Sequence, residues 1–356
     1  MAKTVLVTGA SGFLASYVID AFLAAGWNVR GTVRDPAKAD HIRGRYRSHA
    51  DRLQLVQVKD ITSGEGLKEA VKGVDAVAHV ASPYALTFTD PVKDFIDPAV
   101  KGTLTVLQAA KGNRAGIRVQ DAGVRRVVVT SSFAAVTNFS KGGPWRDYTY
   151  TAADWNPLTL EDCLVPGVAG PVVYSASKTL AEHAAHDFAA ANPDMVISTL
   201  NPPMIYGPPL QKVASRDEIN TSSGAIYALI HGPEGREVPW NRLPLFVHVK
   251  DIGLAHLRVI EAEDEAKIKN QRFLLYGGAF TWEDAISHLA TARPELKSRL
   301  PVLPPSPEQY KDHGKPLAKL DCTPAREVLG MKDLAGWKET LEESIDALVE
   351  IEKRFA

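Results

Sequence analysis

Short apolar runs alternate with longer helical patterns along the first 200 residues of the chain. Several runs are apolar nearly throughout, which is the pattern of strands buried on both faces of a sheet. Helical patterns cover residues 13–25, 92–111 and 175–191, and the first ends at Gly26, a residue suited to a helix C-cap. The predicted strands are residues 4–8, 28–33, 53–58, 76–80, 126–130 and 196–200. This alternation predicts an α/β fold with a doubly wound parallel sheet.

The alternation of strand and helix patterns becomes less regular after residue 200, where prolines and glycines become frequent. Residues 246–261 and 272–276 keep strand and helix patterns, and residues 336–354 form an amphipathic helical pattern. We therefore predict a larger domain of residues 1–200, to which 246–262 and 271–277 return. A smaller C-terminal lobe, residues 201–245 and 278–356, is expected to bind the substrate. The polar, glycine-bearing stretch 112–123 is predicted to be a surface loop.

Composition narrows the class of protein. The 356 residues carry a formal net charge of -1, which favours neither nucleic acid nor an anionic membrane as a partner. The two cysteines, Cys163 and Cys322, have no metal-like spacing and suit a reducing compartment, so no metal site is expected. The N-terminal apolar run is too short for a secretory signal, and no stretch approaches the ~20 apolar residues of a membrane span. A cytoplasmic location is expected by default.

A glycine turn follows the first strand. Gly9 permits a tight turn, Gly12 lets the backbone approach a pyrophosphate, and Ala15 takes the third position, where alanine is allowed. A helix follows at once, and its N-terminus offers free N–H groups and a positive dipole end to phosphate. The strand before and the helix after the glycines support a Rossmann dinucleotide site over an ordinary turn. The predicted contacts are Gly9, Ser11, Gly12, Phe13 and Leu14.

The end of the second strand indicates which dinucleotide binds. NAD enzymes usually carry an acid ~20 residues after the glycines, where it bonds the ribose 2′-OH. Here Val33 is followed by Arg34, which can hold a 2′-phosphate, and Lys38 can add a second charge. Asp35 is expected to cap the helix that starts near Pro36. These residues predict NADPH as the cofactor.

Two further strand ends contribute to the expected cofactor site. Asp60 and Ile61 follow the third strand, where an adenine-contacting pair would lie, although Asp60 is equally suited to cap the next helix. Val80, Ala81 and Ser82 end the fourth strand with residues that allow close approach of a cofactor.

The third group of residues can carry out carbonyl chemistry. The fifth strand leads to Ser132, and a helix carries Tyr174 and Lys178 at i and i+4, on one face. Reduction of a carbonyl by hydride produces an alkoxide that needs a proton. A free tyrosine has a pKa of ~10, and a nearby ammonium lowers it. Tyr174 is therefore the predicted acid, Lys178 its charged neighbour and ribose ligand, and Ser132 the group that holds the substrate oxygen.

These motifs resemble the extended short-chain dehydrogenase/reductase family. The resemblance rests on the Gly9–Gly12 turn, Arg34, Ser132 and the Tyr174–Lys178 pair. Residues 31–34, 78–83, 174–182, 201–208 and 247–256 narrow it to the fungal aldehyde and carbonyl reductases, the yeast methylglyoxal reductase group among them, and to the plant dihydroflavonol reductases. The match runs essentially from end to end.

The resemblance implies an NADPH-dependent reductase that acts on small-molecule aldehydes, ketones and keto esters, as a monomer or homodimer. It implies that Ser132 is catalytic and that Thr130, Tyr174, Lys178 and Pro202 contact the cofactor. Phe88, Phe133 and Met204 are implied near the substrate, with core packing as an equally good interpretation of each.

Other functions remain open on the same fold. A sugar-nucleotide epimerase or dehydratase shares the tyrosine–lysine pair but keeps NAD bound, and Arg34 speaks against it. A non-catalytic NADP-binding regulator would be expected to lose Tyr174. A reductase of acyl thioesters would need a basic pocket rim, which sequence does not reveal.

Overall fold

The computed structural model describes residues 2–82, 88–112 and 124–355. The predicted surface loop at 112–123 lies outside these residues except for Gly112, which ends a helix.

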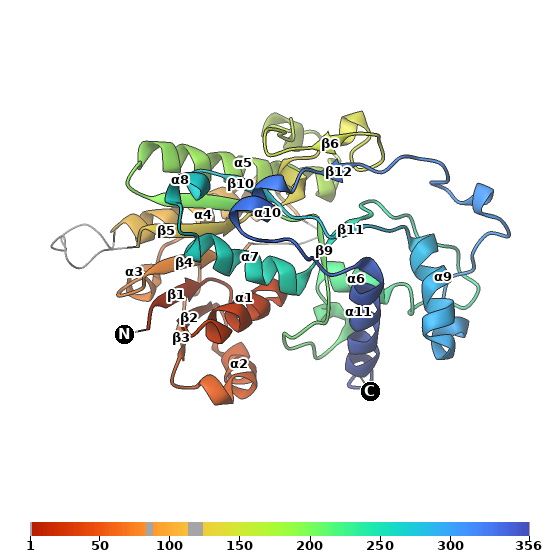
Figure 1. Ribbon diagram of the computed structural model, residues 1–356, viewed down its shortest axis with the longest axis horizontal. Helices are drawn as coiled ribbons and strands as arrows, with labels where there is room; N and C mark the ends of the chain where they lie inside the picture. Colours follow the sequence, from red (N-terminus) through yellow and green to blue (C-terminus); the bar gives the residue numbers. More distant parts are fainter. Residues whose placement is uncertain (1, 83–87, 113–123, 356) are drawn as a thin grey trace.

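Seven parallel strands form the central sheet (Figure 1). The strands are β1 Thr4–Val7, β2 Asn28–Val33, β3 Leu53–Gln57, β4 Ala76–His79, β5 Arg126–Thr130, β7 Val196–Asn201 and β10 Arg272–Leu274. Their order is β10-β7-β5-β4-β1-β2-β3, so the strand order reverses between β1 and β4. The predicted doubly wound α/β fold is confirmed. In such sheets ligands bind outside the carboxyl ends of the strands, at the reversal point.

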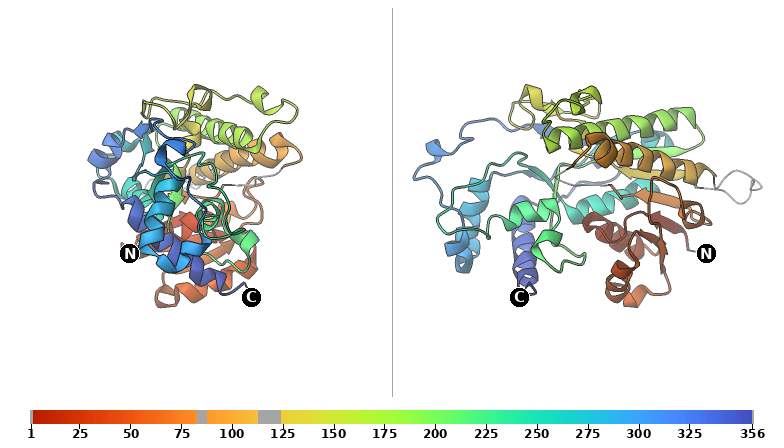
Figure 2. Two further views of the ribbon diagram at one scale, coloured as in Figure 1. Left: turned by 90° about the vertical axis from the view of Figure 1, so that its right-hand side faces the viewer. Right: turned by 180° about the vertical axis from the view of Figure 1, so that it is seen from behind.

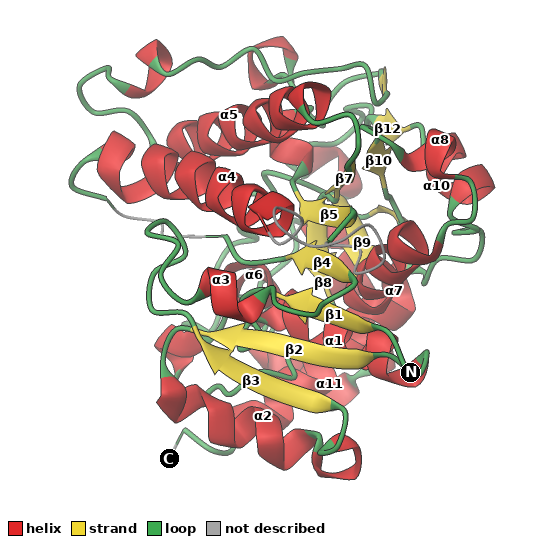
Figure 3. Ribbon diagram, turned by 90° about the vertical axis from the view of Figure 1, so that its left-hand side faces the viewer, coloured by secondary structure: helices red, strands yellow, loops and turns green. Residues whose placement is uncertain are grey.

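Helices cover both faces of this sheet (Figure 3). On one face α1, Phe13–Ala24, packs against α7, Val249–Glu261. On the other face α4, Asp97–Gly112, packs against α5, Gly170–Ala191. The sequence of β1 is apolar throughout because both faces of this strand are buried. Val5 and Val7 point into the core under α1 and α7, whereas Leu6 points into the core under α4 and α5.

Two helices differ from their predicted bounds. Helix α5 begins at Gly170, five residues before the predicted start, because Pro171 fits the first turn of a helix, where its missing N–H costs nothing. Tyr174 therefore lies inside the helix. The helix predicted at 92–111 is interrupted: Val92–Ile96 forms a π-helical turn, and α4 starts at Asp97.

Most of the elements predicted to form the second lobe lie beside the central sheet (Figures 1 and 2). A small sheet joins β8 Met204–Tyr206, β9 Leu245–His248 and β11 Gly278–Ala279. Its core packs Tyr206, Phe246, Phe280 and Trp282 against α6 Thr221–Tyr227, α9 Trp282–Ala292 and α11 Trp337–Glu352. The division into two lobes remains a prediction. One detail differs from it, because the strand of the returning segment 246–262 pairs with β8 and β11 rather than with the central sheet.

The remaining α-helices and β-strands are short. They are α2 Ala39–Arg45, α3 Leu67–Ala70, α8 Glu265–Ile268, α10 Thr323–Val328, β6 Thr149–Tyr150 and β12 Lys319–Leu320. Within the described part of the chain, no helix is both long enough and apolar enough to cross a membrane.

Candidate active site

The turn between β1 and α1 is shaped to receive a phosphate. Gly9 has a φ of 70°, and a Cβ at this position would stand 3.1 Å from Ala81. Gly12 is the N-cap of α1, and no described side chain caps the first turn of this helix. The backbone N–H groups at this helix start are therefore available to an anion. The geometry of this turn fits the pyrophosphate of a dinucleotide.

Strand β2 runs close under this turn. A Cβ on Gly31 would lie 2.7 Å from the Cβ of Ala10, so only glycine allows the two segments to approach this closely. The strand then delivers Arg34 and Lys38 to an exposed surface. Asp35 accepts a hydrogen bond from Ala37 N at 2.9 Å and caps the short helix Pro36–Lys38, as predicted.

A cavity beside the glycine turn joins predicted and unpredicted residues. Ser11 and Lys38, both predicted cofactor contacts, line the same cavity. The fold adds Arg45, from α2, and Lys212, from the segment after β8. Arg45 pairs with Asp20 at 2.9 Å. No local signal marks Lys212 in the sequence, because its position depends on how the second lobe folds back toward the turn.

Thr8 and His79 form a buried polar pair next to the glycine turn. The Thr8 Oγ1 accepts hydrogen bonds from the backbone N–H groups of Val80 and Ala81, each at 3.0 Å. It donates its own proton to His79 Nδ1 at 2.9 Å, because its lone pairs are already used. Burial, and secondarily the charge of Lys178, lowers the pKa of His79 to about 3. The pair fixes the end of β4 against β1.

Tyr174 and Lys178 lie on one face of α5. Lys178 is 8% exposed, and its Nζ lies 5.9 Å from the centroid of the Tyr174 ring. Burial lowers the pKa of Lys178 to about 8, while the negative charge of Glu182 acts in the opposite direction. The structure therefore brings together the predicted acid and its predicted charged neighbour.

Ser132 follows β5 at the start of a short helical turn, Phe133–Ala135. Its Oγ accepts a hydrogen bond from Ala134 N at 3.1 Å, which leaves the hydroxyl proton available for another acceptor. Phe133 N donates to the Pro202 carbonyl at 2.8 Å, so the Ser132 turn is tied to the end of β7.

A narrow cavity connects the ends of the central strands. Among its lining residues are five of the predicted cofactor contacts: Ile61, Ala81, Ser82, Thr130 and Lys178. The Thr130 hydroxyl is also engaged with His256, whose ring nitrogen Nε2 lies 2.7 Å away. Asp60 is exposed, and it accepts hydrogen bonds from Thr62 N and Oγ1, each at 2.8 Å. Asp60 thus caps the turn that follows β3.

The three residues implied near the substrate pack against other side chains. Phe133 is 0% exposed and packs edge-to-face on Tyr150. Phe88 packs edge-to-face on Phe95, with centroids 5.6 Å apart, and Met204 is half-buried against the core of the second lobe. For Phe133 in particular, complete burial favours the packing interpretation.

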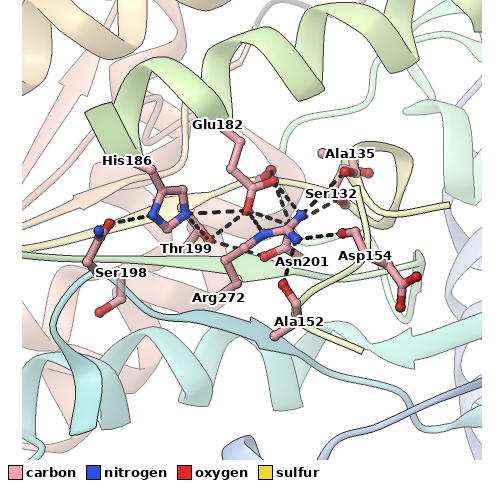
Figure 4. Close-up of polar contacts among 12 residues, drawn as sticks. Ser132, Ala135, Ala152, Asp154, Glu182, His186, Ser198, Thr199, Asn201 and Arg272 are labelled. Carbon is pink, nitrogen blue, oxygen red and sulfur yellow. Dashed lines mark hydrogen bonds and ion pairs between the residues drawn. The ribbon is translucent and has the colours of Figure 1, made fainter. Parts of the chain in front are cut away.

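Four polar residues at this end of the sheet were not predicted. Glu182, Arg272, Asn201 and Thr199 form a buried cluster beside Ser132 (Figure 4). Glu182 also lines the same cavity as Lys178. Glu182 lies four residues after Lys178, and this helical spacing is the one signal that the sequence offers for it. Among the described residues, no group of three or more His, Cys, Asp or Glu side chains is arranged to hold a metal ion.

The fold and the glycine turn are those of dinucleotide-binding proteins. A model of the NAD dependent epimerase/dehydratase family matches residues 5–272. The chain belongs to this family, which is the extended short-chain dehydrogenase/reductase family that the motifs indicated.

Two similar proteins and one solved structure narrow the position of the chain within this family. It is 39% identical to an uncharacterized oxidoreductase of Schizosaccharomyces pombe, over 79% of this chain and 80% of that protein. It is 33% identical to a ketoreductase of Aspergillus niger, over 93% of both chains. A crystal structure of yeast methylglyoxal/isovaleraldehyde reductase Gre2 complexed with NADPH matches with a TM-score of 0.86 and 28% identity, over 99% of both chains.

Proposed function

We propose that this protein reduces aldehydes and ketones, keto esters among them, to alcohols with NADPH, and that Tyr174 donates the proton. One observation carries the proposal: Lys178 is buried beside the Tyr174 ring, in a cavity that also receives the ends of β4 and β5. The kinship with a ketoreductase and with an NADPH-dependent methylglyoxal reductase supports the same reaction class.

The residues of the site have distinct roles in this reaction. NADPH, when bound, supplies the hydride. The Tyr174 hydroxyl donates a proton to the oxygen that becomes negative as the carbonyl is reduced. The Lys178 ammonium stabilises the tyrosinate that remains. The Ser132 hydroxyl, whose proton is not used by the Ala134 contact, donates a hydrogen bond to the same substrate oxygen and holds it in line.

The surface after β2 supports NADPH over NADH. Arg34 and Lys38 are both exposed there and can pair with a 2′-phosphate. Asp35, the one acid at this strand end, is occupied as a helix cap rather than being available to a ribose hydroxyl. An acidic side chain available to the ribose at the end of β2 would instead favour a retained NAD, as in a sugar-nucleotide epimerase.

The proposal is tested by following reduced-nicotinamide absorbance with NADPH and NADH in parallel. The substrates offered are an alkyl aldehyde, an aryl ketone, a β-keto ester and a 1,2-dicarbonyl. We expect carbonyl-dependent oxidation of NADPH with NADH much poorer. Tight NADPH binding without turnover of any substrate would contradict the proposal and favour a non-catalytic NADP-binding regulator. Faster turnover with NADH would contradict the assignment of Arg34.

A further inference from the structure

Glu182 is a carboxylate without exposed side-chain surface at the carboxyl end of the central sheet. It follows Tyr174 and Lys178 on α5 at intervals of four residues, so the three side chains lie along one face of the helix. Lys178 and Glu182 line the same cavity. A buried charge is costly unless other groups satisfy it, so its partners indicate why it is retained.

Both carboxylate oxygens of Glu182 accept several hydrogen bonds. Oε1 accepts from Thr199 Oγ1 at 2.8 Å, Asn201 Nδ2 at 2.9 Å and Arg272 Nε at 2.8 Å. Oε2 accepts from Ser131 Oγ at 2.6 Å and again from Asn201 Nδ2 at 2.7 Å. Thr199 and Asn201 belong to β7, Arg272 belongs to β10, and Ser131 directly follows β5. One carboxylate therefore connects three neighbouring strands to α5, and Figure 4 shows its contacts with Thr199, Asn201 and Arg272.

The same donors hold the turn that carries Ser132. Asn201 Nδ2 donates to the Ser132 carbonyl at 3.3 Å as well as to Glu182. Arg272 Nη2 donates to the carbonyl of Ala135 at 3.3 Å. Ser131, the direct neighbour of Ser132, donates a hydrogen bond from its hydroxyl to Glu182. The backbone on both sides of Ser132 is therefore tied to the Glu182 carboxylate or its partners.

Arg272 is held firmly in turn. Its Nη1 donates to the carbonyls of Ala152 at 2.7 Å and Asp154 at 2.6 Å, and its guanidinium lies 3.6 Å above the Trp155 ring. A buried ion pair of this kind usually adds little stability compared with apolar residues of similar volume. Stability alone therefore gives a weak reason for placing this pair beside Ser132 and Lys178.

We propose that Glu182 is a positioning residue for carbonyl reduction: together with Arg272 and Asn201 it fixes the Ser132 turn against α5 and places a negative charge next to Lys178. This inference rests on the proposed function, because it assigns Glu182 a role in that reaction. Glu182 itself need not touch the substrate or the cofactor.

The titratable groups around Lys178 and Glu182 determine the charge of each residue. His79, from β4, faces Lys178 and is neutral at neutral pH, because burial and the charge of Lys178 lower its pKa. His183 and His186, from α5, and Arg272, from β10, surround Glu182. Burial acts to raise the pKa of Glu182, but the charge of Arg272 and the hydrogen bonds from His186, Arg272 and Ser131 lower it to about 2. Glu182 is thus negative over the working pH range.

The test replaces Glu182 by glutamine in the full chain, which removes the charge and keeps the shape. The pKa of Lys178 is measured by NMR on protein labelled with [ε-13C]lysine, with the resonance assigned by Lys178→Met. We expect Glu182→Gln to lower the pKa of Lys178 by about one unit, because an opposite charge favours the ammonium. The matched control is Glu265→Gln, which breaks the ion pair with Arg126 at the other end of β5. This control should leave the pKa of Lys178 unchanged.

Kinetics supply a second readout. In Glu182→Gln we expect kcat to fall about 10- to 100-fold, while the Kd for NADPH changes less than about threefold. The alkaline limb of the pH profile should move to lower pH together with Lys178. An unchanged Lys178 pKa and an unchanged limb in folded Glu182→Gln would overturn the proposal.

A pairwise replacement covers the case in which Glu182→Gln does not fold. Glu182→Leu combined with Arg272→Met replaces the ion pair by apolar side chains, a change that is often neutral for stability. Wild-type activity and a wild-type Lys178 pKa in this variant would show a structural role alone and overturn the proposal; a folded but slow enzyme with a lowered Lys178 pKa would support it. If the wild-type chain oxidises no NADPH, the proposed function fails, whereas the NMR titration still decides whether Glu182 controls the charge of Lys178.

Discussion

The Nζ of Lys178 lies 5.9 Å from the centre of the Tyr174 ring, close enough for the ammonium charge to act on the phenol. Removal of the phenolic hydroxyl should therefore remove the proton donor while leaving the ring in place. We expect Tyr174→Phe to lower kcat at least about 100-fold, in line with the usual contribution of a positioned acid. The measurement is NADPH oxidation at saturating substrate.

NADPH binding is the control for this variant. A fluorescence titration should give a Kd within a few-fold of the wild-type value, because the glycine turn and Arg34 are unchanged. Turnover that survives in Tyr174→Phe would mean that another group supplies the proton.

The lowered pKa of Lys178 predicts a pH dependence. Burial lowers this pKa to about 8, so the ammonium is present below pH 8 and is lost as the pH rises through this value. Because kcat/KM reports groups of the free enzyme, kcat/KM for NADPH should be level below pH 8 and fall above it. A profile that stays level up to about pH 10, the range of an ordinary lysine, would contradict this prediction.

Arg34 is expected to distinguish the two nicotinamide cofactors. Arg34→Ala should weaken NADPH binding about 10- to 100-fold, the usual worth of hydrogen bonds to a charged group, and should leave NADH nearly unaffected. The control is Arg43→Ala, which removes an exposed arginine of α2 that pairs with Asp40. Titration of each variant with both cofactors checks the prediction, and equal losses for NADPH and NADH would count against a 2′-phosphate contact.

Gly31 should tolerate no side chain. A Cβ there would stand 2.7 Å from the Cβ of Ala10 and 3.0 Å from Leu55, so Gly31→Ala should lower the free energy of unfolding by about 1–3 kcal/mol. Gly44→Ala is the matched control, because a Cβ on this residue of helix α2 would meet nothing within 4 Å. This control should be neutral or stabilising by up to about 1 kcal/mol. Urea denaturation measures both, and a Gly31→Ala protein as stable as wild type would contradict the close approach.

The central sheet could be predicted from sequence because its strands are buried on both faces. Continuous apolar runs such as Val5–Val7 have few alternative structures when helices separate them. The start of α5 was predicted too late, because residues 170–174 have no amphipathic pattern and only Pro171 marks the first turn. The residue range of the second lobe could be proposed from sequence, but the pairing of its strands could not, since the short strands β8, β9 and β11 pair across long stretches of sequence.

Site residues that lie close together in the sequence were predicted, whereas those brought together by the fold were not. The spacing of Tyr174 and Lys178 and the order of Gly9 and Gly12 are local features, so the sequence alone revealed them. Arg272 and Asn201 reach Glu182 only through the order of strands in the sheet. A buried polar cluster of this kind produces no periodic pattern in the sequence, because its members come from α5, β7 and β10, which are far apart along the chain.

The distance along the chain between Glu182 and Arg272 has a consequence for synthesis. Arg272 lies 90 residues after its partner and enters the sheet as the edge strand β10. A nascent chain that has left the ribosome only as far as β7 holds a carboxylate that lacks its cation, and a lone buried charge opposes compaction. The early strands can pack against α1 and α4 during translation. The end of the sheet that carries Ser132 is expected to reach its final packing only after Arg272 has left the ribosome.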